Sequence, residues 1–193
     1  TPVVYIREPA SLYKSRLQQE AKLGVFLRPF EHYSLRATIE QVENCFDNKP
    51  MIRAFATEKL IGGDVLQDFF GEVLDLKVEP MPLRRNKSIS AEAVCALISI
   101  AAAVQQTGCD LRDHELWQLM HKIRMYKDDD GLLSKHDIKP SVEAKIRDTA
   151  VDYVWLRDRY GVEFGELDYE SISELKEGEE NAFAQLSDVV DVN

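Results

Sequence analysis

Apolar residues in the first part of the chain fall into patterns that predict alternating strands and helices. The run Val3–Ile6 is short, apolar and rich in β-branched residues, which is typical of a strand buried on both faces. Pro9 favours the first turn of a helix and Gly24 favours a helix end, so we expect one helix between them. After a turn at residues 47–50, residues 51–55 predict a second buried strand.

Helical periodicity predicts most of the remaining elements. Ser34 and Ser90 each precede a periodic apolar stretch and are suited to cap a helix, and residues 62–64 are expected to open another helix between them. Another helix is expected over residues 110–126. The order strand, helix, helix, strand, helix favours an α/β fold with a parallel sheet, followed by a helix-rich C-terminal half.

Pro140 is predicted to begin the last strong helix, which we expect to stop before Gly161. Its apolar residues align on one face: Val142, Ile146, Ala150 and Val154. Beyond Gly161 no regular structure is predicted with the same clarity. We therefore expect a folded domain over residues 1–161 and a C-terminal extension over residues 162–193.

Composition and charge place this 193-residue chain among ordinary globular proteins, with 45% hydrophobic and 30% charged residues. The formal net charge of −10 is uneven. Residues 1–159 carry 23 basic and 24 acidic residues, whereas residues 160–193 carry 1 and 10. An acidic tail on a nearly neutral body argues against a nucleic acid as partner, but a pocket for a small anion remains compatible with it.

The three cysteines are widely spaced and form no CxxC pair, so neither a disulfide framework nor a cysteine zinc site is indicated. We expect free thiols in a reducing, cytoplasmic environment. The longest apolar run, from Ala93 to Val104, is shorter than the roughly 20 residues that span a bilayer. No membrane span is therefore predicted.

The segment with the clearest candidate chemistry surrounds Arg7. A buried strand ends there, a tight turn follows, and the N-terminal amides of the next helix are expected to point back toward the strand end. Such amides attract phosphate, and an arginine fork suits a phosphate dianion. Ser15, eight residues on, can add a hydroxyl. The plainer interpretation is a surface arginine and serine on an ordinary strand–helix unit.

The residues of this segment, VVYIREPASLYKSRLQQ, resemble the 3′-phosphate-binding strand–loop–helix of sulfotransferases. These enzymes use 3′-phosphoadenosine 5′-phosphosulfate (PAPS) as donor. Three later parts of the chain are similar, in family order, to bacterial carbohydrate-type members: residues 52–55 with 60–65 and 68–70, then residues 86–93, and then residues 153–161. Each stretch alone is moderately specific, and their common order strengthens the resemblance.

The resemblance implies a P-loop-like, three-layer α/β fold and transfer of a sulfuryl group from PAPS to a hydroxyl or amine of a carbohydrate-type acceptor. By position, it implies that Arg7 and Ser15 hold the 3′-phosphate of the donor, without a metal. The family's second donor motif, a Lys and Ser/Thr loop that cradles the 5′-phosphosulfate, is expected upstream of Thr1. The catalytic base is not identified.

Two alternatives stay open. One is a non-catalytic binding or scaffold module that retains the sulfotransferase-like fold. The other, a P-loop kinase, lacks support because no G-x-x-x-x-G-K-[ST] motif occurs. A strand followed by a Lys and Ser/Thr loop upstream of Thr1 would favour the enzyme over the scaffold.

Secondary candidates are weaker. Arg85 and Lys87 belong to a basic loop that could close over the donor phosphate or an anionic acceptor, although such runs are usually only solvated. His32 could act as a base, and His114 and His121 lie on one predicted helix face. No third ligand is spaced to join the two histidines in a metal site.

Overall fold

The computed structural model describes residues 1–24, 34–79, 88–108, 110, 113–126, 132–173 and 189–190. The chain divides into two compact units. The first unit comprises Thr1–Leu12, His32–Arg85 and Ile146–Glu174, and the second comprises Tyr13–Glu31, Asn86–Lys145 and Leu175–Asn193. Each unit is built from segments that are far apart in the sequence.

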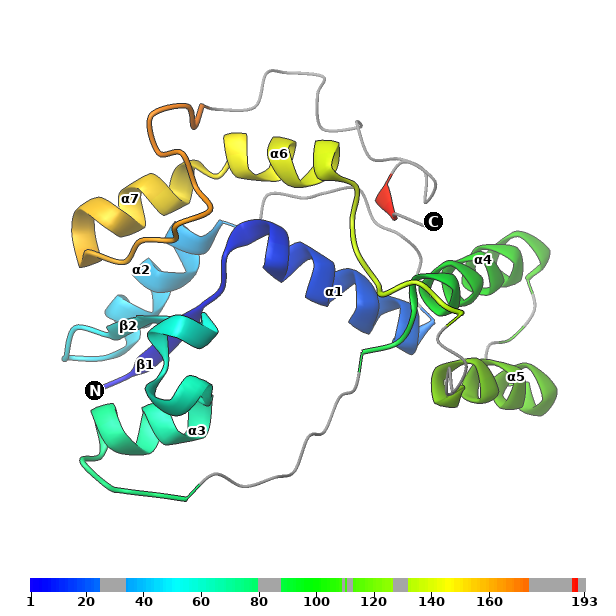
Figure 1. Ribbon diagram of the computed structural model, residues 1–193, viewed down its shortest axis with the longest axis horizontal. Coiled ribbons are helices and arrows are strands. Elements are labelled where there is room, and N and C mark those ends of the chain that lie inside the picture. The colour runs from blue at the N-terminus through cyan, green and yellow to red at the C-terminus, as the bar shows by residue number, and fades with distance from the viewer. Residues whose placement is uncertain are drawn as a thin grey trace. The chain divides into compact units, whose positions relative to one another are not determined.

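A two-stranded parallel sheet lies at the centre of the first unit (Figure 1). Strand β1 (Val3–Ile6) pairs with β2 (Met51–Ala54), and Tyr5 lies opposite Arg53 in the register. The predicted parallel pairing and the mixed α/β class are confirmed. Full burial of both strands is wrong, because only Ile6 of β1 is buried and the other strand residues are half-buried or exposed.

One face of the sheet packs into the core of the first unit. Val4, Ile6, Ile52 and Ala54 contribute from the strands, as the period-two alternation of a strand requires. Helices α2 (Leu35–Cys45) and α7 (Val151–Tyr160) supply the facing side chains, which are Leu35, Ile39, Tyr153 and Leu156. Each fully buried aliphatic side chain on this face contributes about 1.5–3 kcal/mol to the stability of the first unit.

The core of the first unit continues past the end of α7. Gly161 ends that helix in the left-handed region with φ of 67°, where a residue with a Cβ is strained. Phe164 and Leu167, beyond the domain boundary expected at residue 161, are buried in the core. The Phe164 amide donates to the Tyr169 hydroxyl at 2.9 Å. This part of the acidic extension therefore belongs to the first unit.

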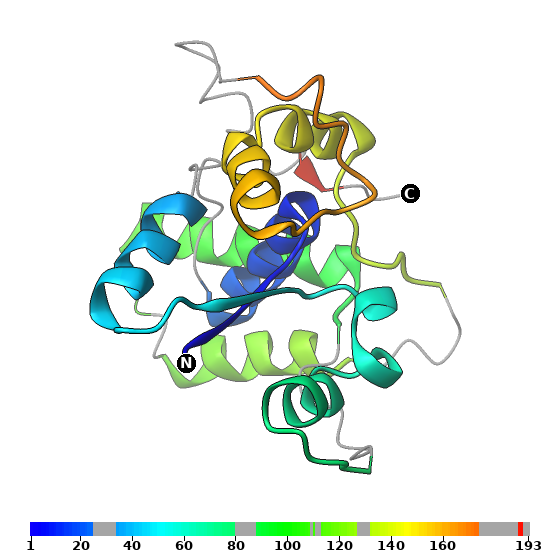
Figure 2. The same cartoon turned by 90° about the vertical axis from the view of Figure 1, so that its left-hand side faces the viewer.

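The opposite face of the sheet is covered by a short helical segment, so that the strands lie between α7 and this segment (Figure 2). Two 3-10 turns, η1 (Thr57–Lys59) and η2 (Ile61–Gly63), lead to α3 (Val65–Asp68) and a π-helical turn, η3 (Phe69–Val73). Helix α3 begins after Asp64 as predicted, and the Asp64 side chain caps it by accepting from the amides of Leu66 and Gln67. The expected apolar stripe is only partly buried, since Leu66 is 50% exposed.

The second unit contains the remaining helices. Helix α4 (Ala91–Thr107) buries Val94, Leu97, Ile98 and Ala101, and it lies beside α5 (His114–Met125) (Figure 1). Ser90 caps α4 as predicted, accepting from the Ala93 amide at 3.1 Å. Helix α1 (Pro9–Leu23) begins in the first unit and continues into the second. Of the helices in the described ranges, none has the length and apolar character needed to cross a membrane.

The last predicted helix is wrong in one respect, because the structure breaks it into α6 (Pro140–Asp148) and α7. Ala150 between them has non-helical φ and ψ of −82° and 54°. The Asp148 carbonyl accepts from the Ser173 amide at 2.8 Å instead of continuing the helical ladder. The β-branched Thr149 and Val151 flank the break and have low helix propensity, so the tertiary contact overrides a weak local preference.

Candidate functional site

Arg7 follows the last residue of β1, as the sequence predicted. Alternation along the strand places it on the sheet face that also carries Tyr5 and Arg53, opposite the apolar core face. The guanidinium carbon lies over the Phe55 ring, 4.5 Å from its centroid. The Arg7 carbonyl accepts a hydrogen bond from the Tyr153 hydroxyl at 2.7 Å. The Arg7 backbone is therefore held by the Tyr153 hydroxyl, and its guanidinium is held by the Phe55 ring.

Arg7 carries its charge without a carboxylate partner in the described part of the chain. Its side chain is half-buried, and burial lowers the pKa of the guanidinium, which nevertheless stays charged at neutral pH. Several other arginines pair with carboxylates: Arg16, Arg36, Arg53, Arg147, Arg157 and Arg159. A partly desolvated guanidinium with five N–H donors and no carboxylate is chemically suited to an oxyanion.

The N-terminus of α1 is occupied by the chain itself. The Glu8 carboxylate accepts from the amides of Ala10 at 3.1 Å and Ser11 at 2.6 Å. Arg147 Nε donates to the same carboxylate at 2.9 Å, and Glu8 is only 6% exposed. The expectation that these helix amides face a phosphate is therefore wrong. A carboxylate two and three residues before these amides accepts hydrogen bonds from them and compensates the helix dipole locally.

Ser15 lies in the second turn of α1 and is half-buried. It belongs to the second unit, whereas Arg7 belongs to the first. The joint role of the two residues stays a prediction. Arg85 and Lys87 of the basic loop, and also His32, lie outside the described residues.

A buried ionic cluster beside the Arg7 site was missed by the sequence reasoning. Asp68 has no exposed surface and accepts from Arg53 Nε at 2.6 Å and from Arg53 Nη2 at 2.7 Å. Tyr5 donates its hydroxyl to the same carboxylate at 2.7 Å, and the Ile61 amide donates at 3.1 Å. Strand alternation could have given a signal, because Tyr5 and Arg53 are polar positions on one face of a predicted sheet.

The protonation states of this cluster follow from its contacts. Burial, reinforced by the Asp68 carboxylate, raises the pKa of Tyr5 to about 12. Burial alone would raise the pKa of Asp68, but hydrogen bonds from Arg53 and Tyr5 outweigh it and hold that pKa below its usual range. At neutral pH, Asp68 is ionised and paired while Tyr5 keeps its proton. The cluster anchors α3 to the sheet and offers no free base.

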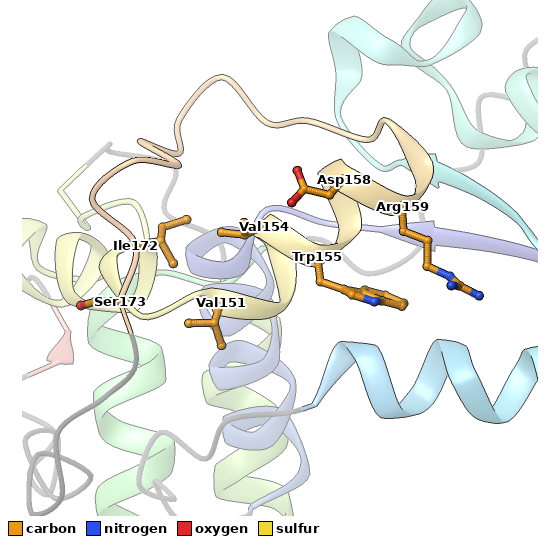
Figure 3. Close-up of a pocket in the computed structure, with 7 residues that line it drawn as sticks. All are labelled: Val151, Val154, Trp155, Asp158, Arg159, Ile172 and Ser173. Atoms are coloured by element: carbon orange, nitrogen blue, oxygen red, sulfur yellow. The ribbon is translucent and has the colours of Figure 1, made fainter.

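A shallow pocket lies elsewhere on the first unit, along the outer face of α7 (Figure 3). Its lining combines residues of α7 with two residues of the following segment: Val151, Val154, Trp155, Asp158, Arg159, Ile172 and Ser173. Its charged groups are already paired, Asp158 with Arg157 at 2.9 Å and Arg159 with Glu43 at 2.9 Å. None of the residues predicted to bind the donor lines this pocket.

The histidines of α5 serve local contacts. The His121 ring stacks on Trp117, with centroids 5.2 Å apart and ring planes at 5°. His114 contacts the Gln118 amide at 2.7 Å. Within the described ranges, no three histidine, cysteine or acidic side chains are grouped so as to hold a metal ion.

No protein-family model, curated protein or solved structure matches this chain. Sequence resemblance and the geometry around Arg7 are therefore the two sources for any functional assignment.

Proposed function

We propose that this chain is a sulfotransferase-like protein that takes a sulfuryl group from PAPS and transfers it to a hydroxyl or amine of a carbohydrate-type acceptor. In this proposal Arg7 and Ser15 hold the 3′-phosphate of the donor, and Arg85 and Lys87 belong to a loop that approaches the donor or acceptor. The proposal includes a P-loop-like, three-layer α/β fold, in which β1 and β2 are two strands of a parallel sheet flanked by helices. It also includes a cytoplasmic location.

The proposal is carried by one observation: Arg7, at the carboxyl end of a parallel strand, has a half-buried side chain with an unpaired charge among the described residues. Ligands of α/β proteins bind at the carboxyl ends of the strands. There, Arg7 presents a half-buried guanidinium with no carboxylate partner among the described residues. An anionic ligand compensates the cost of desolvating this cation, and a phosphate dianion matches its fork of donors.

The residues present fit a phosphate through the Arg7 side chain and not through the α1 amides. Glu8 already fills the helix N-terminus, and Arg147 compensates its charge. Its carboxylate therefore does not leave a net negative charge beside Arg7. The Ser15 hydroxyl enters the proposal on the sequence resemblance, which matches its eight-residue separation from Arg7.

The proposed reaction is an in-line transfer. An acceptor oxygen or nitrogen forms a bond to sulfur while the bond between sulfur and the bridging phosphate oxygen breaks. The acceptor proton passes to a base, and adenosine 3′,5′-bisphosphate leaves with the bridging oxygen. Such transfer depends mainly on positioning and on neutralising oxygen charge, as phosphoryl transfer does. Arg7 contributes by fixing the non-reacting end of the donor.

A non-catalytic module with the same fold is the alternative. The closed α1 N-terminus favours it to a limited extent, because it removes backbone donors that would otherwise strengthen nucleotide binding. Enzyme and scaffold differ in activity, and both remain compatible with an oxyanion at Arg7.

The test is the thermal unfolding of the full chain with adenosine 3′,5′-bisphosphate, the desulfated product. A ligand of the native state at about 100 times its Kd adds about 2.7 kcal/mol to the free energy of unfolding. We expect a rise in Tm for the wild type and for Arg36→Ala, whose arginine already pairs with Glu40. Arg7→Ala should abolish the rise. A wild type without any shift at millimolar nucleotide contradicts the proposal.

An assay of sulfuryl transfer separates the two candidates. Labelled sulfate appearing on an oligosaccharide supports the enzyme. Nucleotide binding without transfer to any of a panel of hydroxyl and amine acceptors supports the non-catalytic module.

A further inference from the structure

Phe55 lies directly under the side chain of Arg7. The Arg7 guanidinium carbon is 4.5 Å from the centroid of the Phe55 ring. The Phe55 amide donates to the Ile6 carbonyl at 2.6 Å. This hydrogen bond extends the β1–β2 pairing by one step and fixes the backbone that carries the ring beside the backbone that carries Arg7. Neither backbone can shift along the sheet without breaking this hydrogen bond.

The Phe55 ring is itself held in place by a chain of contacts. Tyr5 meets it edge to face, with ring centroids 6.4 Å apart and ring planes at 89°. The Tyr5 hydroxyl is bonded to the fully buried Asp68 carboxylate. Arg53 also donates two hydrogen bonds to Asp68, so the acceptor of the Tyr5 hydroxyl is fixed. The Tyr5 ring therefore cannot rotate far from Phe55 without losing its hydrogen bond. The surface under Arg7 is therefore rigid and reaches down to the ionic cluster.

A rigid aromatic surface has two consequences for the arginine above it. It restricts a side chain that otherwise loses substantial rotamer entropy when it binds a ligand. It also attracts the guanidinium through the ring quadrupole without neutralising its charge. An aromatic partner covers one side of the guanidinium and accepts none of its hydrogen bonds strongly, so the N–H donors remain available to oxygen acceptors.

We propose that Phe55 is a positioning residue of the anion site. Before any ligand binds, it holds the Arg7 side chain in the conformation that binds a tetrahedral oxyanion. The inference rests on the proposed function, in which that oxyanion is the 3′-phosphate of the donor nucleotide. Phe55 acts through Arg7 and does not itself touch the reacting atoms.

The experiment is calorimetric titration of the full chain with adenosine 3′,5′-bisphosphate, and with inorganic phosphate as a probe that lacks the base. The variants are Phe55→Leu, which removes the ring, Phe55→Tyr, which keeps it, and Arg7→Ala. Ordering a rotamer-rich side chain costs enough that Phe55→Leu should weaken binding about 2-fold to 12-fold. Phe55→Tyr should restore wild-type affinity.

The salt dependence of binding distinguishes positioning from charge loss. Phe55→Leu removes no charge, so the slope of log Kd against log salt concentration should equal that of the wild type. Arg7→Ala removes the cation itself and should abolish detectable binding at every salt concentration. A variant that was merely misfolded would lose both affinity and slope.

A second measurement needs no variant. Because the Phe55 ring lies over the guanidinium, its ring current should displace the Arg7 Nε–H proton resonance of the wild-type protein to a lower chemical shift. This readout tests the contact between Phe55 and Arg7 even where Phe55→Leu does not fold.

The outcomes separate this inference from the proposed function. Wild-type affinity in Phe55→Leu, or an Arg7 resonance without ring-current displacement, overturns the positioning role, while loss of binding in Arg7→Ala leaves the proposed function standing. Absence of binding to the wild type by both probes overturns the two together. Weaker binding in Phe55→Leu with rescue in Phe55→Tyr supports the positioning role.

Discussion

The hydroxyl of Tyr153 donates to the carbonyl of Arg7 over 2.7 Å, and so joins α7 to the end of β1. Tyr153 is otherwise a core residue, 6% exposed, with its ring 5.7 Å from that of Phe164. Burial raises the pKa of Tyr153, with the nearby Glu8 charge acting in the same direction, so the hydroxyl remains a donor across the physiological range. This hydrogen bond thus ties the segment that carries the proposed anion site to α7.

Replacing Tyr153 by phenylalanine removes this hydrogen bond and keeps the apolar burial. We expect Tyr153→Phe to lower the free energy of unfolding by about 1 kcal/mol, measured by urea denaturation. Tyr126→Phe, at a position that is 67% exposed, is the control and should leave stability unchanged. Equal effects of the two substitutions contradict a specific role for the bond to Arg7.

Asp68 and Glu72 form a matched pair of tests, since both contact Arg53. Asp68 is fully buried and bonded through both of its oxygens, whereas Glu72 is 47% exposed and lies 3.5 Å from Arg53. Because breaking a buried pair leaves an uncompensated charge, Asp68→Asn should cost about 3 kcal/mol. Glu72→Gln should cost almost nothing, as exposed pairs do. Comparable losses in the two variants would show that Asp68 is not the anchor of α3.

Glu8 should be required for the stability of α1 and not for anion binding. Glu8→Gln weakens the cap on the Ala10 and Ser11 amides and removes the charge paired with Arg147, so we expect a loss of about 1–2 kcal/mol in urea denaturation. Glu40→Gln, an exposed partner of Arg36, is the control. Since the proposed ligand contact is Arg7, Glu8→Gln should retain nucleotide binding. Loss of binding at unchanged stability is the contrary result.

The buried position of His136 leads us to expect that acid lowers the stability of the second unit. Its Nε2 lies 3.2 Å from the Lys14 carbonyl, which only accepts, so Nε2 carries the proton. Its Nδ1 is buried and has no partner among the described residues. Burial lowers the pKa of His136. The Lys14 ammonium acts in the same direction, whereas the Lys14 carbonyl and the Asp137 carboxylate oppose the shift.

A histidine whose pKa is lower in the folded state binds its proton more readily when unfolded. The neutral, buried histidine therefore makes its full contribution to stability above about pH 6.5, the ordinary pKa of a histidine in the unfolded chain. That contribution is lost as the pH falls below this value. We expect the drop in unfolding free energy between about pH 7.5 and about pH 5 to be larger for the wild type than for His136→Gln. His121→Gln, on an exposed face of α5, should behave like the wild type. Identical pH profiles for wild type and His136→Gln contradict this account.

Local patterns in the sequence were sufficient for much of the fold. The runs of apolar residues predicted β1 and β2, and the capping residues Ser34, Asp64 and Ser90 each begin a helix where the sequence placed it. These features depend on neighbours within a few positions. The break at Ala150 was missed because it depends on a bond from Ser173 to Asp148, which lies 25 residues away and leaves no periodic signal.

The candidate site divides in the same way. Arg7 at a strand end was predictable from strand length and from the helix start at Pro9. Its environment was not, because Phe55 and Tyr153 reach it only through folding. The Glu8 cap was predictable from local sequence, because a carboxylate precedes the helix amides that donate to it. The prediction assigned these amides to a phosphate instead. Asp68 lies within an apolar stretch of the sequence. Its partners Tyr5 and Arg53 could be identified only from the register of the sheet, which brings them side by side.

The most direct test of the central claim follows the Arg7 side chain itself during titration. In the NMR spectrum of the full chain, we expect the Arg7 Nε–H resonance to shift saturably as adenosine 3′,5′-bisphosphate is added, because the guanidinium donates to phosphate oxygens. The Arg36 and Arg53 resonances, whose side chains are already paired with carboxylates, should move little. An Arg7 resonance that stays unchanged up to millimolar nucleotide would contradict the assignment of the donor site.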